Sequence, residues 1–509
     1  MMKSRIFIFI LVFATATAHA QVGREKDMEM RELWKQTQNA AGLALDSTAD
    51  HGLSYFDGRH TSGNFARVQD GTQTNQLRFF TERKQKIGNY LYGYGRFDFD
   101  YGRTKNRAWG DCLRPHNSNP YFSASSIPGK YDFQDFDFTA ALGTIDFGGW
   151  HFGARLDYKA GDFSRLRDPR SRNKLLDYTL TPALTYTVQR HTIGLSGHYR
   201  RRKEKLVGLT TVQNDPNLLY YLLSGMEHAE GTVGGYSSFN REWVDHRFGA
   251  QLDYAYRAPR LTSLTSLSIE RGEEQALGLY KYEPGRYFSY VYGFQEQLRV
   301  IHNDRLASNV QLQATYEQAY ADEYKMQLLQ EKDSATGFTS YSYDRLIAFK
   351  KRYQVNVLNA AFDYRLTFGR HDCATGYVGM GANFEDVKNK HLMPLSELRY
   401  GRLTGALKGG ISLLTGRLWA EGEAHYSHAT KSTLQLADAT TDYAQGVLLP
   451  DMNVLSADYW RASLAVTYSF RLSLFKRPST WFVRAYGDLL KADHSLDRKQ
   501  VGLTVGLFN

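Results

Sequence analysis

The sequence lacks long hydrophobic runs. Only 42% of its 509 residues are apolar, and the mean hydropathy is −0.50. A membrane-spanning helix needs about 20 consecutive apolar residues, and a bundle of such helices would raise this average. The composition therefore excludes a bundle of membrane helices.

Aromatic residues, in contrast, are abundant: 35 Tyr, 29 Phe and 7 Trp. A chain this rich in large apolar groups buries far more surface than a disordered chain, so disorder is excluded. Two classes remain, a large soluble protein and a membrane β-barrel. In a barrel, lipid-facing and water-facing residues alternate and cancel in any average.

The first 20 residues have the pattern of a secretory signal peptide. Lys3 and Arg5 precede an apolar run over residues 6–13, and Ala18-His19-Ala20 has the small-x-small form of a cleavage site. We expect cleavage near Ala20, and Gln21 gives no lipid-anchored start. Removing the two basic residues leaves 61 basic against 53 acidic side chains, a net charge of +8. That excess is modest and predicts no nucleic-acid partner.

Cysteine is nearly absent, and catalytic motifs are missing. Cys112 and Cys373 fall at opposite ends of the strand pattern described below, so we expect two free thiols. The chain has no Gly-x-Ser-x-Gly elbow, no phosphate-binding glycine loop and no Cys/His zinc spacing. We therefore predict no metal, no cofactor and no identifiable catalytic residue. A barrel can still assemble an active site from separate strands, so an enzyme stays an open alternative.

Alternation by two residues dominates the chain after about residue 45. Between residues 151 and 159, apolar side chains (Phe152, Ala154, Leu156, Tyr158) alternate with polar or small ones (His151, Gly153, Arg155, Asp157, Lys159). The same alternation recurs over 178–188 and 460–471. Only a β-strand sorts residues in this way.

Three observations favour a membrane barrel over a soluble sheet. Apolar faces begin or end in aromatics, as with Trp460 and Phe470, which suits the two membrane interfaces. The opposite faces carry charges that a dry core would not tolerate but a water-filled lumen would. Connections also alternate between short and long, as expected of periplasmic turns and extracellular loops. The long ones are predicted at 104–130, 161–173, 203–241, 273–285, 322–349, 387–396 and 431–455.

The pattern predicts an all-β transmembrane antiparallel barrel of about 18 strands over residues 51–509. Because residues 52–65 and 387–400 alternate weakly, 16 strands is the alternative. The expected strands are 52–65, 74–85, 88–102, 131–146, 149–160, 174–188, 191–203, 243–257, 259–273, 286–301, 305–321, 350–367, 371–386, 397–414, 417–430, 456–473, 479–490 and 498–508.

Charged side chains on the polar faces are the candidates for lining the lumen. They are Arg155, Asp157, Asp363, Arg365, Arg402, Lys408, Glu421, Glu423, His425, Arg461 and Arg471. Glu421, Glu423 and His425 share one face about 7 Å apart, so cation binding or acid/base work is possible there, but solvating the channel is the favoured role. His425 and His428 face opposite sides of a strand, which argues against a shared metal.

Two further segments are candidates for filling the barrel. Residues 21–50 predict a periplasmic or luminal segment with a short helix, acting as a small plug, a periplasmic contact or a tethered end. In the loop 203–241, Asp215 and Pro216 suit a helix start before an apolar run that ends at Ser224 and Gly225. This predicted helix packs under neighbouring loops, constricts the mouth or docks a partner. Its residues are Leu218, Leu219, Tyr220, Tyr221, Leu222 and Leu223.

The chain resembles a known kind of barrel at both ends. Residues 501–509 close with Phe508, which is similar to the signal read by the barrel-assembly machinery, although Asn509 follows it. The start from Arg31-Glu32-Leu33-Trp34 to Asn39-Ala40-Ala41-Gly42-Leu43 resembles an uncharacterised outer-membrane β-barrel family of Bacteroides-type Gram-negative bacteria. The resemblance implies fold and location but no activity.

The sequence therefore predicts an outer-membrane barrel that acts as a pore or uptake component for small polar solutes. The alternatives are a barrel-based hydrolase or lipid-modifying enzyme, and a scaffold for surface lipoproteins. Expected partners are outer-membrane lipids and the barrel-assembly machinery, with a surface lipoprotein as a further candidate. A basic run (Arg200, Arg201, Arg202, Lys203, Lys205) at the predicted outer rim could meet lipopolysaccharide phosphates, or could simply be a solvated patch.

Overall fold

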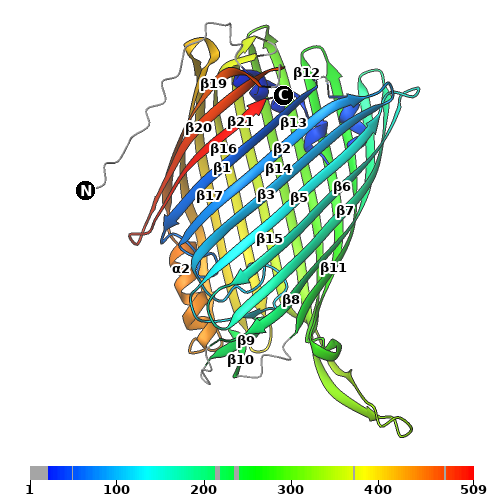
Figure 1. Ribbon diagram of the computed structural model, residues 1–509, viewed down its shortest axis with the longest axis vertical. Coiled ribbons are helices and arrows are strands. Elements are labelled where there is room, and N and C mark those ends of the chain that lie inside the picture. Colours follow the sequence, from blue (N-terminus) through cyan, green and yellow to red (C-terminus); the bar gives the residue numbers. More distant parts are fainter. Residues whose placement is uncertain are drawn as a thin grey trace.

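Eighteen strands form one closed antiparallel barrel in the computed structural model (Figure 1). The structure describes residues 21–46, 48, 50–212, 218–233, 240–370, 373–474 and 477–508. Each barrel strand pairs with its neighbours in chain order, and β1 pairs with β21 from Leu53–Phe508 to Gly63–Arg498, which closes the ring. The 18-strand prediction is confirmed, and the 16-strand alternative is wrong.

The first nine barrel strands are β1 (His51–Gly63), β2 (Gln73–Ile87), β3 (Leu91–Arg107), β5 (Gly129–Thr144), β6 (Trp150–Arg165), β7 (Arg170–Val188), β8 (His191–Thr210), β11 (Arg241–Ala258) and β12 (Leu261–Leu277). The remaining nine are β13 (Gly285–Asn303), β14 (Leu306–Lys332), β15 (Thr339–Arg370), β16 (Cys373–His391), β17 (Ser396–Leu413), β18 (Leu418–Gln435), β19 (Tyr459–Leu474), β20 (Arg477–Ala492) and β21 (Asp497–Phe508). The strands meet in short turns at one end, as at Gly148-Gly149, where φ values of 67° and 90° suit glycine. Following the sequence prediction, we call this the periplasmic end and the opposite one the extracellular end.

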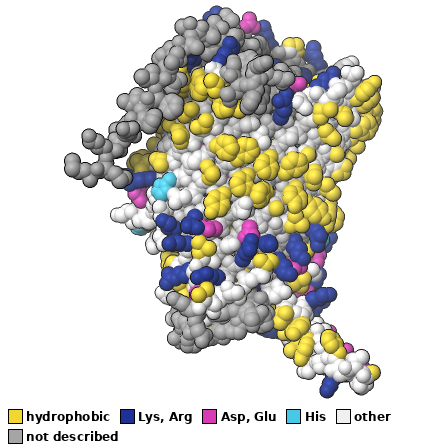
Figure 2. Space-filling view, in the orientation of Figure 1, with side chains coloured by type: hydrophobic (Ala, Val, Ile, Leu, Met, Phe, Trp, Pro, Cys, Tyr) yellow, Lys and Arg dark blue, Asp and Glu magenta, His cyan; other side chains and the backbone are white. Residues whose placement is uncertain are grey.

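Side chains sort by strand phase as the alternation predicts. Leu464 is 62% exposed on the outer wall, whereas its neighbour Ala465 is 6% exposed and faces inward. Hydrophobic side chains cover the middle of the barrel wall, and charged ones gather toward the extracellular end (Figure 2). None of the helices in the described ranges has the length and apolarity needed to cross a membrane.

Several strands run past their predicted ends at the extracellular side. β14 and β15 continue to Lys332 and from Thr339, so most of the predicted loop 322–349 is a two-stranded ribbon that projects from the barrel (Figure 1). β8 continues to Thr210, which places the basic run inside a strand instead of at the rim. Strand phase then splits the run: Arg202 is buried and bonds Glu204 at 2.6 Å, whereas Lys203 pairs with Glu242 at 2.8 Å.

The helix predicted over residues 218–223 is wrong. Leu219–Gly225 is strand β9, which pairs with β10 (His228–Val233) and β4 (Ser123–Ala124) in a separate three-stranded sheet. A six-residue apolar run is too short for periodicity to separate helix from strand. Gly225 and Met226, with φ values of 119° and 50°, make the turn that folds β10 back onto β9. Asp215 and Pro216 lie outside the described residues.

This small sheet belongs to an apolar core that closes the extracellular end of the barrel. We call it the cap: residues 107–128, β9–β10 and the helical segment η6–α2 (Ala444–Leu448 and Leu449–Leu455). The ring of Trp109 lies 4.5 Å from that of Tyr221 and 5.2 Å from that of Tyr443. Inward side chains from seven consecutive strands of the wall pack against the cap, among them Trp243, Ala276, Tyr287, Ala321, Val355, Val387 and Tyr400. This part of the lumen therefore contains an apolar core that the sequence did not predict, next to buried ion pairs such as Arg114 with Glu274.

The two cysteines form no disulfide with each other and lie at opposite ends of the barrel, as predicted. Cys112 is buried in the cap, and Cys373 begins β16 at the periplasmic end. Burial raises the pKa of the Cys112 thiol above its ordinary value, which keeps that thiol protonated and unreactive.

The two faces of the wall predict that arginine substitutions at adjacent positions of β19 have very different effects on the folding free energy. Leu464→Arg places a charge on the lipid face midway between Trp460 and Tyr468, and we expect a loss of about 2–4 kcal/mol of folding free energy. Ser463→Arg faces the lumen between Glu423 and Asp488 on the neighbouring strands, and we expect a change near zero. Urea unfolding in lipid vesicles measures both. Equal losses would contradict the assigned faces.

Candidate functional site

The N-terminal segment, residues 21–46, lies inside the periplasmic end of the barrel. It comprises helix α1 (Gln21–Arg31) and the short helices η1 (Trp34–Gln36) and η2 (Ala40–Ala44). Because its polar contacts reach strands on different sides of the ring, the segment occupies the lumen. These contacts are Asp27 with Arg299 of β13 (2.7 Å), Lys26 with Glu421 of β18 (3.3 Å), Asn39 with Asp253 of β11 (2.9 Å) and Glu32 with Lys84 of β2 (3.3 Å).

Glycines in the wall let η2 approach the backbone of the strands. A Cβ at Gly153 would lie 2.2 Å from the amide nitrogen of Ala41, and a Cβ at Gly143 would lie 2.4 Å from the carbonyl oxygen of Ala40. Side chains at these two positions would therefore collide with the segment. The Asn39 side chain accepts a hydrogen bond from the Ala41 amide and begins η2. The run of small residues after Asn39 thus fits a recess in β5 and β6.

A buried ionic cluster anchors the middle of the segment. Lys84, with a side chain only 2% exposed, lies 3.3 Å from Glu32 and 3.8 Å from Asp46. Lys35 bridges Glu32 at 3.2 Å and Glu82 of β2 at 3.1 Å. Removing Lys84 would leave two buried carboxylates short of a cation, a cost on the order of 3–5 kcal/mol.

Burial shifts the pKa values of carboxyls on the segment. It raises the pKa of Glu25 to about 7 and that of Asp46 to about 6. Burial also acts on Glu32, but His51, Lys35 and Lys84 outweigh it and hold the pKa of Glu32 below its ordinary value. Glu25 and Asp46 therefore take up protons when the segment docks, whereas Glu32 stays ionised.

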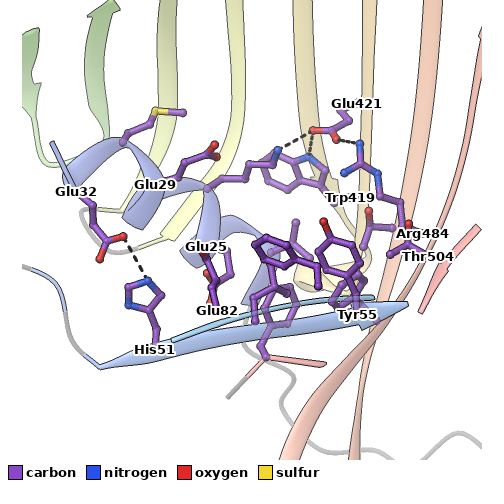
Figure 3. Close-up of a pocket in the computed structure, with 18 of the residues that line it drawn as sticks. Glu25, Glu29, Glu32, His51, Tyr55, Glu82, Trp419, Glu421, Arg484 and Thr504 are labelled. Atoms are coloured by element: carbon purple, nitrogen blue, oxygen red, sulfur yellow. Dashed lines mark hydrogen bonds and ion pairs between the residues drawn. The ribbon is translucent and has the colours of Figure 1, made fainter. Parts of the chain in front are cut away.

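A cavity of about 930 Å³ lies between the segment and the wall. One stripe of α1 faces it with Val22, Glu25, Lys26 and Glu29, spaced three and four residues apart. The wall contributes charged and aromatic side chains from strands on both sides of the β1–β21 closure. Figure 3 shows Glu32 and His51 on one side of this cavity and Glu421, Trp419 and Arg484 on the other.

Glu421 joins the helix to the wall on the second side. Its carboxylate lies 3.3 Å from Lys26 and 2.8 Å from Arg484 of β20, and it accepts a hydrogen bond from Trp419 Nε1 at 3.2 Å. Burial of Glu421 is thus matched by two cations. The sequence favours a channel-solvating role for this carboxylate, and in the structure it also contacts Lys26 of α1.

Aromatic rings form the remaining wall of the cavity. Tyr55 of β1 stacks on Phe80 of β2 with centroids 5.0 Å apart, and Phe482 lies 4.8 Å from Phe508. The guanidinium of Arg78 sits over Phe80 at 5.2 Å. Charged and aromatic groups side by side suit polar molecules that also carry apolar parts.

The cavity brings together four of the predicted lumen residues: Arg155, Asp363, Arg365 and Glu421. Two others support them from the same wall. Asp157 bonds Arg155 at 2.8 Å, and Lys408 forms an ion pair with Asp363.

The other predicted lumen residues lie away from the cavity. Glu423 and His425 pair with each other at 3.2 Å, and Arg461 pairs with Asp488 at 2.5 Å. Arg402 donates to the carbonyls of Val454, Leu455 and Ala457 and so ties β17 to the cap. Arg471 lies on β19 near the periplasmic turn.

Sequence reasoning missed the wall residues of β1 and β2, among them Tyr55, Arg59, Arg78 and Glu82. Their strands carry aromatics on both faces, since Phe56 points to lipid and Tyr55 to the lumen. The alternation therefore did not reveal which face of these strands lines the lumen. Spacing on α1 did contain a signal, because Glu25, Glu29 and Glu32 recur at helical intervals. Within the described ranges, no group of three or more His, Cys, Asp or Glu side chains is placed to hold a metal.

The raised pKa values predict that the segment docks more weakly as the pH rises. A carboxyl with a higher pKa in the docked state favours docking at low pH and loses this effect as the pH passes through 6–7. We expect hydrogen–deuterium exchange, corrected for its intrinsic pH dependence, to reveal at least about tenfold less protection of residues 21–46 at pH 8 than at pH 5.5. Glu25→Gln should reduce this difference, and equal protection at both pH values would contradict it.

The glycine recess predicts that one added side chain releases the segment. Gly153→Val collides with Ala41, and overpacking typically costs about 1–3 kcal/mol, so trypsin should cleave after Arg31 and Lys35 roughly tenfold faster than in the parent protein. The matched control is Gly95→Val on β3, where an added Cβ meets nothing within 4 Å. Equal cleavage in both variants would argue against the recess.

One family model matches the chain over residues 40–509, that of a family of unknown function, DUF6850. No curated protein matches the chain.

Among solved structures, three outer-membrane proteins are similar over most of the chain. The alcaligin outer-membrane receptor FauA of Bordetella pertussis is 7% identical, with 89% of this chain and 75% of that chain covered and a TM-score of 0.39. OccAB4 of Acinetobacter baumannii is 10% identical (91% and 98% covered, TM-score 0.35), and OpdK of Pseudomonas aeruginosa is 10% identical (90% and 99% covered, TM-score 0.36). At this distance no residue or role is transferred from them. The family match spans the barrel and η2, and the chain therefore belongs to the DUF6850 family, a family of unknown function.

Proposed function

We propose that this protein is an outer-membrane passage for small polar solutes that is shut at both ends in the state described here. The N-terminal segment closes the periplasmic end, and the cap closes the extracellular end. The observation that carries the proposal is the cavity of about 930 Å³, lined by charged and aromatic groups inside a barrel of 18 strands. Barrels of this size hold an aqueous channel unless something fills them.

The segment is suited to move because the barrel does not depend on it. All strand pairs of the wall form without residues 21–46, and the closing pair β1–β21 begins at Leu53. Many of the contacts that hold the segment are ion pairs and hydrogen bonds, which water can replace on release. Release would therefore leave the barrel intact and open its periplasmic half.

The cap resists opening more strongly. Its apolar core is larger than the clusters under the segment, and each buried aromatic ring exposed to water would cost roughly 1.5–3 kcal/mol. Hydrogen bonds add to this core, such as Trp243 Nε1 to the carbonyl of Tyr121 at 2.7 Å. Loop candidates Tyr221 and Leu223 are buried in this core, which supports a constricting role for β9.

A second candidate, a scaffold for a surface lipoprotein, is favoured by the β14–β15 ribbon. Beyond the barrel it exposes Leu328 (47%), Phe338 (71%) and Leu346 (62%) to solvent. An isolated two-stranded ribbon is marginal in water, so a partner would stabilise it.

We also propose how the protein reaches and contacts the outer membrane. The apolar outer wall supports contact with outer-membrane lipids, and a C-terminal strand that closes the ring next to Phe508 supports insertion by the barrel-assembly machinery. Cleavage near Ala20 and an origin in Bacteroides-type bacteria are proposed on the sequence alone.

The two closures act in series, so we expect each to limit conduction. In planar bilayers the parent protein should conduct little, deletion of residues 21–46 or replacement of residues 218–233 by a Gly-Ser linker should raise conductance modestly, and the double variant should conduct most. Removing residues 326–345 from the ribbon, which lies outside the barrel, serves as the control and should change nothing. A double variant that folds but neither conducts nor leaks sugars from liposomes would rule out a passage and favour the scaffold.

A further inference from the structure

A buried polar patch on β13 and β14 lies under helix α1. Gln297 and Arg299 occupy alternate positions of β13 and both contact the N-terminal segment, so they share the inner face about 7 Å apart at the strand rise. Asn309 of β14 is the direct cross-strand partner of Arg299. The three residues are only 1%, 7% and 9% exposed, respectively. We call them the β13–β14 patch.

Asp27 of α1 covers this patch without satisfying it. Its Oδ1 atom accepts a hydrogen bond from Arg299 Nη2 at 2.7 Å, but Arg299 Nη1 is buried and has no hydrogen-bond partner among the described residues. Asp27 Oδ2 lies 3.5 Å from Arg31 and receives no hydrogen bond from the described part of the chain. Arginine and carboxylate often pair through two parallel hydrogen bonds. Asp27 and Arg299 therefore make half of the contact that each could make.

Two amide oxygens beside Arg299 are also unmatched. Gln297 donates from Nε2 to the carbonyl of Leu33 at 3.3 Å, and its Oε1 atom is buried without a partner in the described ranges. Asn309 donates from Nδ2 to Thr367 at 3.5 Å, and its Oδ1 atom likewise receives no hydrogen bond there. Buried acceptors without a donor cost free energy. The patch thus offers one unused donor and, next to it, two unused acceptors.

The other buried cation that holds the segment is matched in full. Lys84 Nζ lies 2.9 Å from Thr48 Oγ1, 3.3 Å from Glu32 and 3.8 Å from Asp46. An ammonium group has three donors, and three oxygen atoms surround this one. Because this end of the chain can satisfy a buried cation completely at Lys84, its incomplete contact at Arg299 favours a patch shaped for a different ligand.

The cavity leads to the patch. Asn309 lines the cavity of about 930 Å³, together with Gln311 of the same strand and Met30 of α1. A solute in the cavity therefore meets Asn309 while the segment is still docked. It reaches Arg299 only by displacing Asp27.

We propose that the β13–β14 patch binds a free α-amino acid, and that Asp27 occupies the carboxylate position of this site while the segment is docked. The carboxylate of the amino acid pairs with both Nη atoms of Arg299, and its ammonium group donates to Gln297 Oε1 and Asn309 Oδ1. Both charged groups are attached to one carbon atom, which suits side chains whose backbone positions are about 5–7 Å apart.

Other small solutes match the patch less well. A neutral sugar would leave the Arg299 guanidinium without a counter-ion. A carboxylate without an amine would leave the amide oxygens of Gln297 and Asn309 unmatched. Only a molecule that carries both charges close together satisfies all three side chains.

The inference rests on the proposed passage and names its solute class and its trigger. Because the amino acid and Asp27 compete for Arg299, each weakens the binding of the other. Arrival of the solute therefore favours release of the segment that closes the periplasmic end.

Hydrogen–deuterium exchange of the purified full-length protein at pH 7 tests this competition. L-Alanine should lower the protection of residues 21–46 in a saturable manner. Propionate lacks the ammonium group, and L-alaninamide lacks the carboxylate. Each should need at least about tenfold higher concentration for the same effect, because each loses charge-assisted hydrogen bonds.

Variants separate a ligand site from a structural anchor. Asp27→Ala removes the competitor, so L-alanine should bind about tenfold more tightly in isothermal titration calorimetry, whereas loss of a mere anchor would create no affinity. Adding Arg299→Gln should abolish this binding. Gln297→Leu should weaken binding of L-alanine about tenfold and leave that of propionate unchanged. Arg96→Gln, in the cavity and paired with Asp137 at 2.9 Å, is the matched control and should bind like the parent protein. The heat-modifiable gel mobility of each barrel reports whether the variants fold.

Two results overturn the inference: L-alanine that binds neither the parent protein nor Asp27→Ala, or propionate and L-alaninamide that bind as tightly as L-alanine. In the first case ordered water fills the patch and Asp27 is only an anchor. The proposed passage fails separately. If L-alanine displaces the segment but no variant conducts, the passage is wrong and the patch is an amino-acid-binding site. If L-alanine does not bind but the double variant conducts, the passage stands and the amino acid is wrong.

Discussion

Closure of the strand ladder between β1 and β21 is the constraint on which the rest of the structure depends. In lipid an unpaired backbone amide or carbonyl costs several kcal/mol, so a membrane sheet cannot keep an open edge. The register from Leu53–Phe508 to Gly63–Arg498 removes both edges at once. Closing the sheet also fixes which side chains face inward. It therefore determines both the charged wall of the cavity and the apolar wall residues that contact the cap.

The two closures of the lumen differ in the size of their apolar cores, and we expect this difference to give them different roles. The cap buries rings such as Trp109, Tyr221 and Tyr443 in a continuous apolar core. The N-terminal segment is held by a recess of glycines, by three small apolar clusters and by ion pairs that include Glu32 with Lys84. The cap also holds ionic contacts to the wall, such as Arg114 with Glu274, and the segment also makes apolar ones, such as Trp34 with Leu264. The apolar cores under the segment are smaller than the core of the cap, so the segment is the closure that we expect to move.

The sequence predicted the barrel well because lipid imposes a strict two-residue period. Every predicted strand overlaps an observed one, including the weak first strand, and Arg155, Asp363, Arg365 and Glu421 were placed in the lumen by phase alone. Prediction failed in segments that do not contact lipid, because no two-residue period is imposed on them. Leu218–Leu223 lies in a loop whose fold is set by tertiary packing on Ser123–Ala124, and no local signal separates strand from helix there. The partners of Glu32 and Asp27 were equally hidden, since contacts between a luminal segment and distant strands leave no sequence period.

Cross-linking the segment to the wall tests the passage most directly. With Cys112 and Cys373 replaced by Ser, Asn39→Cys and Asp253→Cys would be joined by a short reducible thiol cross-linker at the contact of 2.9 Å between their native side chains. The readout is single-channel current of the cap-deleted barrel at pH 8. We expect the current to fall to baseline on cross-linking and to return on reduction. A current that does not change on cross-linking would show that the N-terminal segment does not gate the lumen.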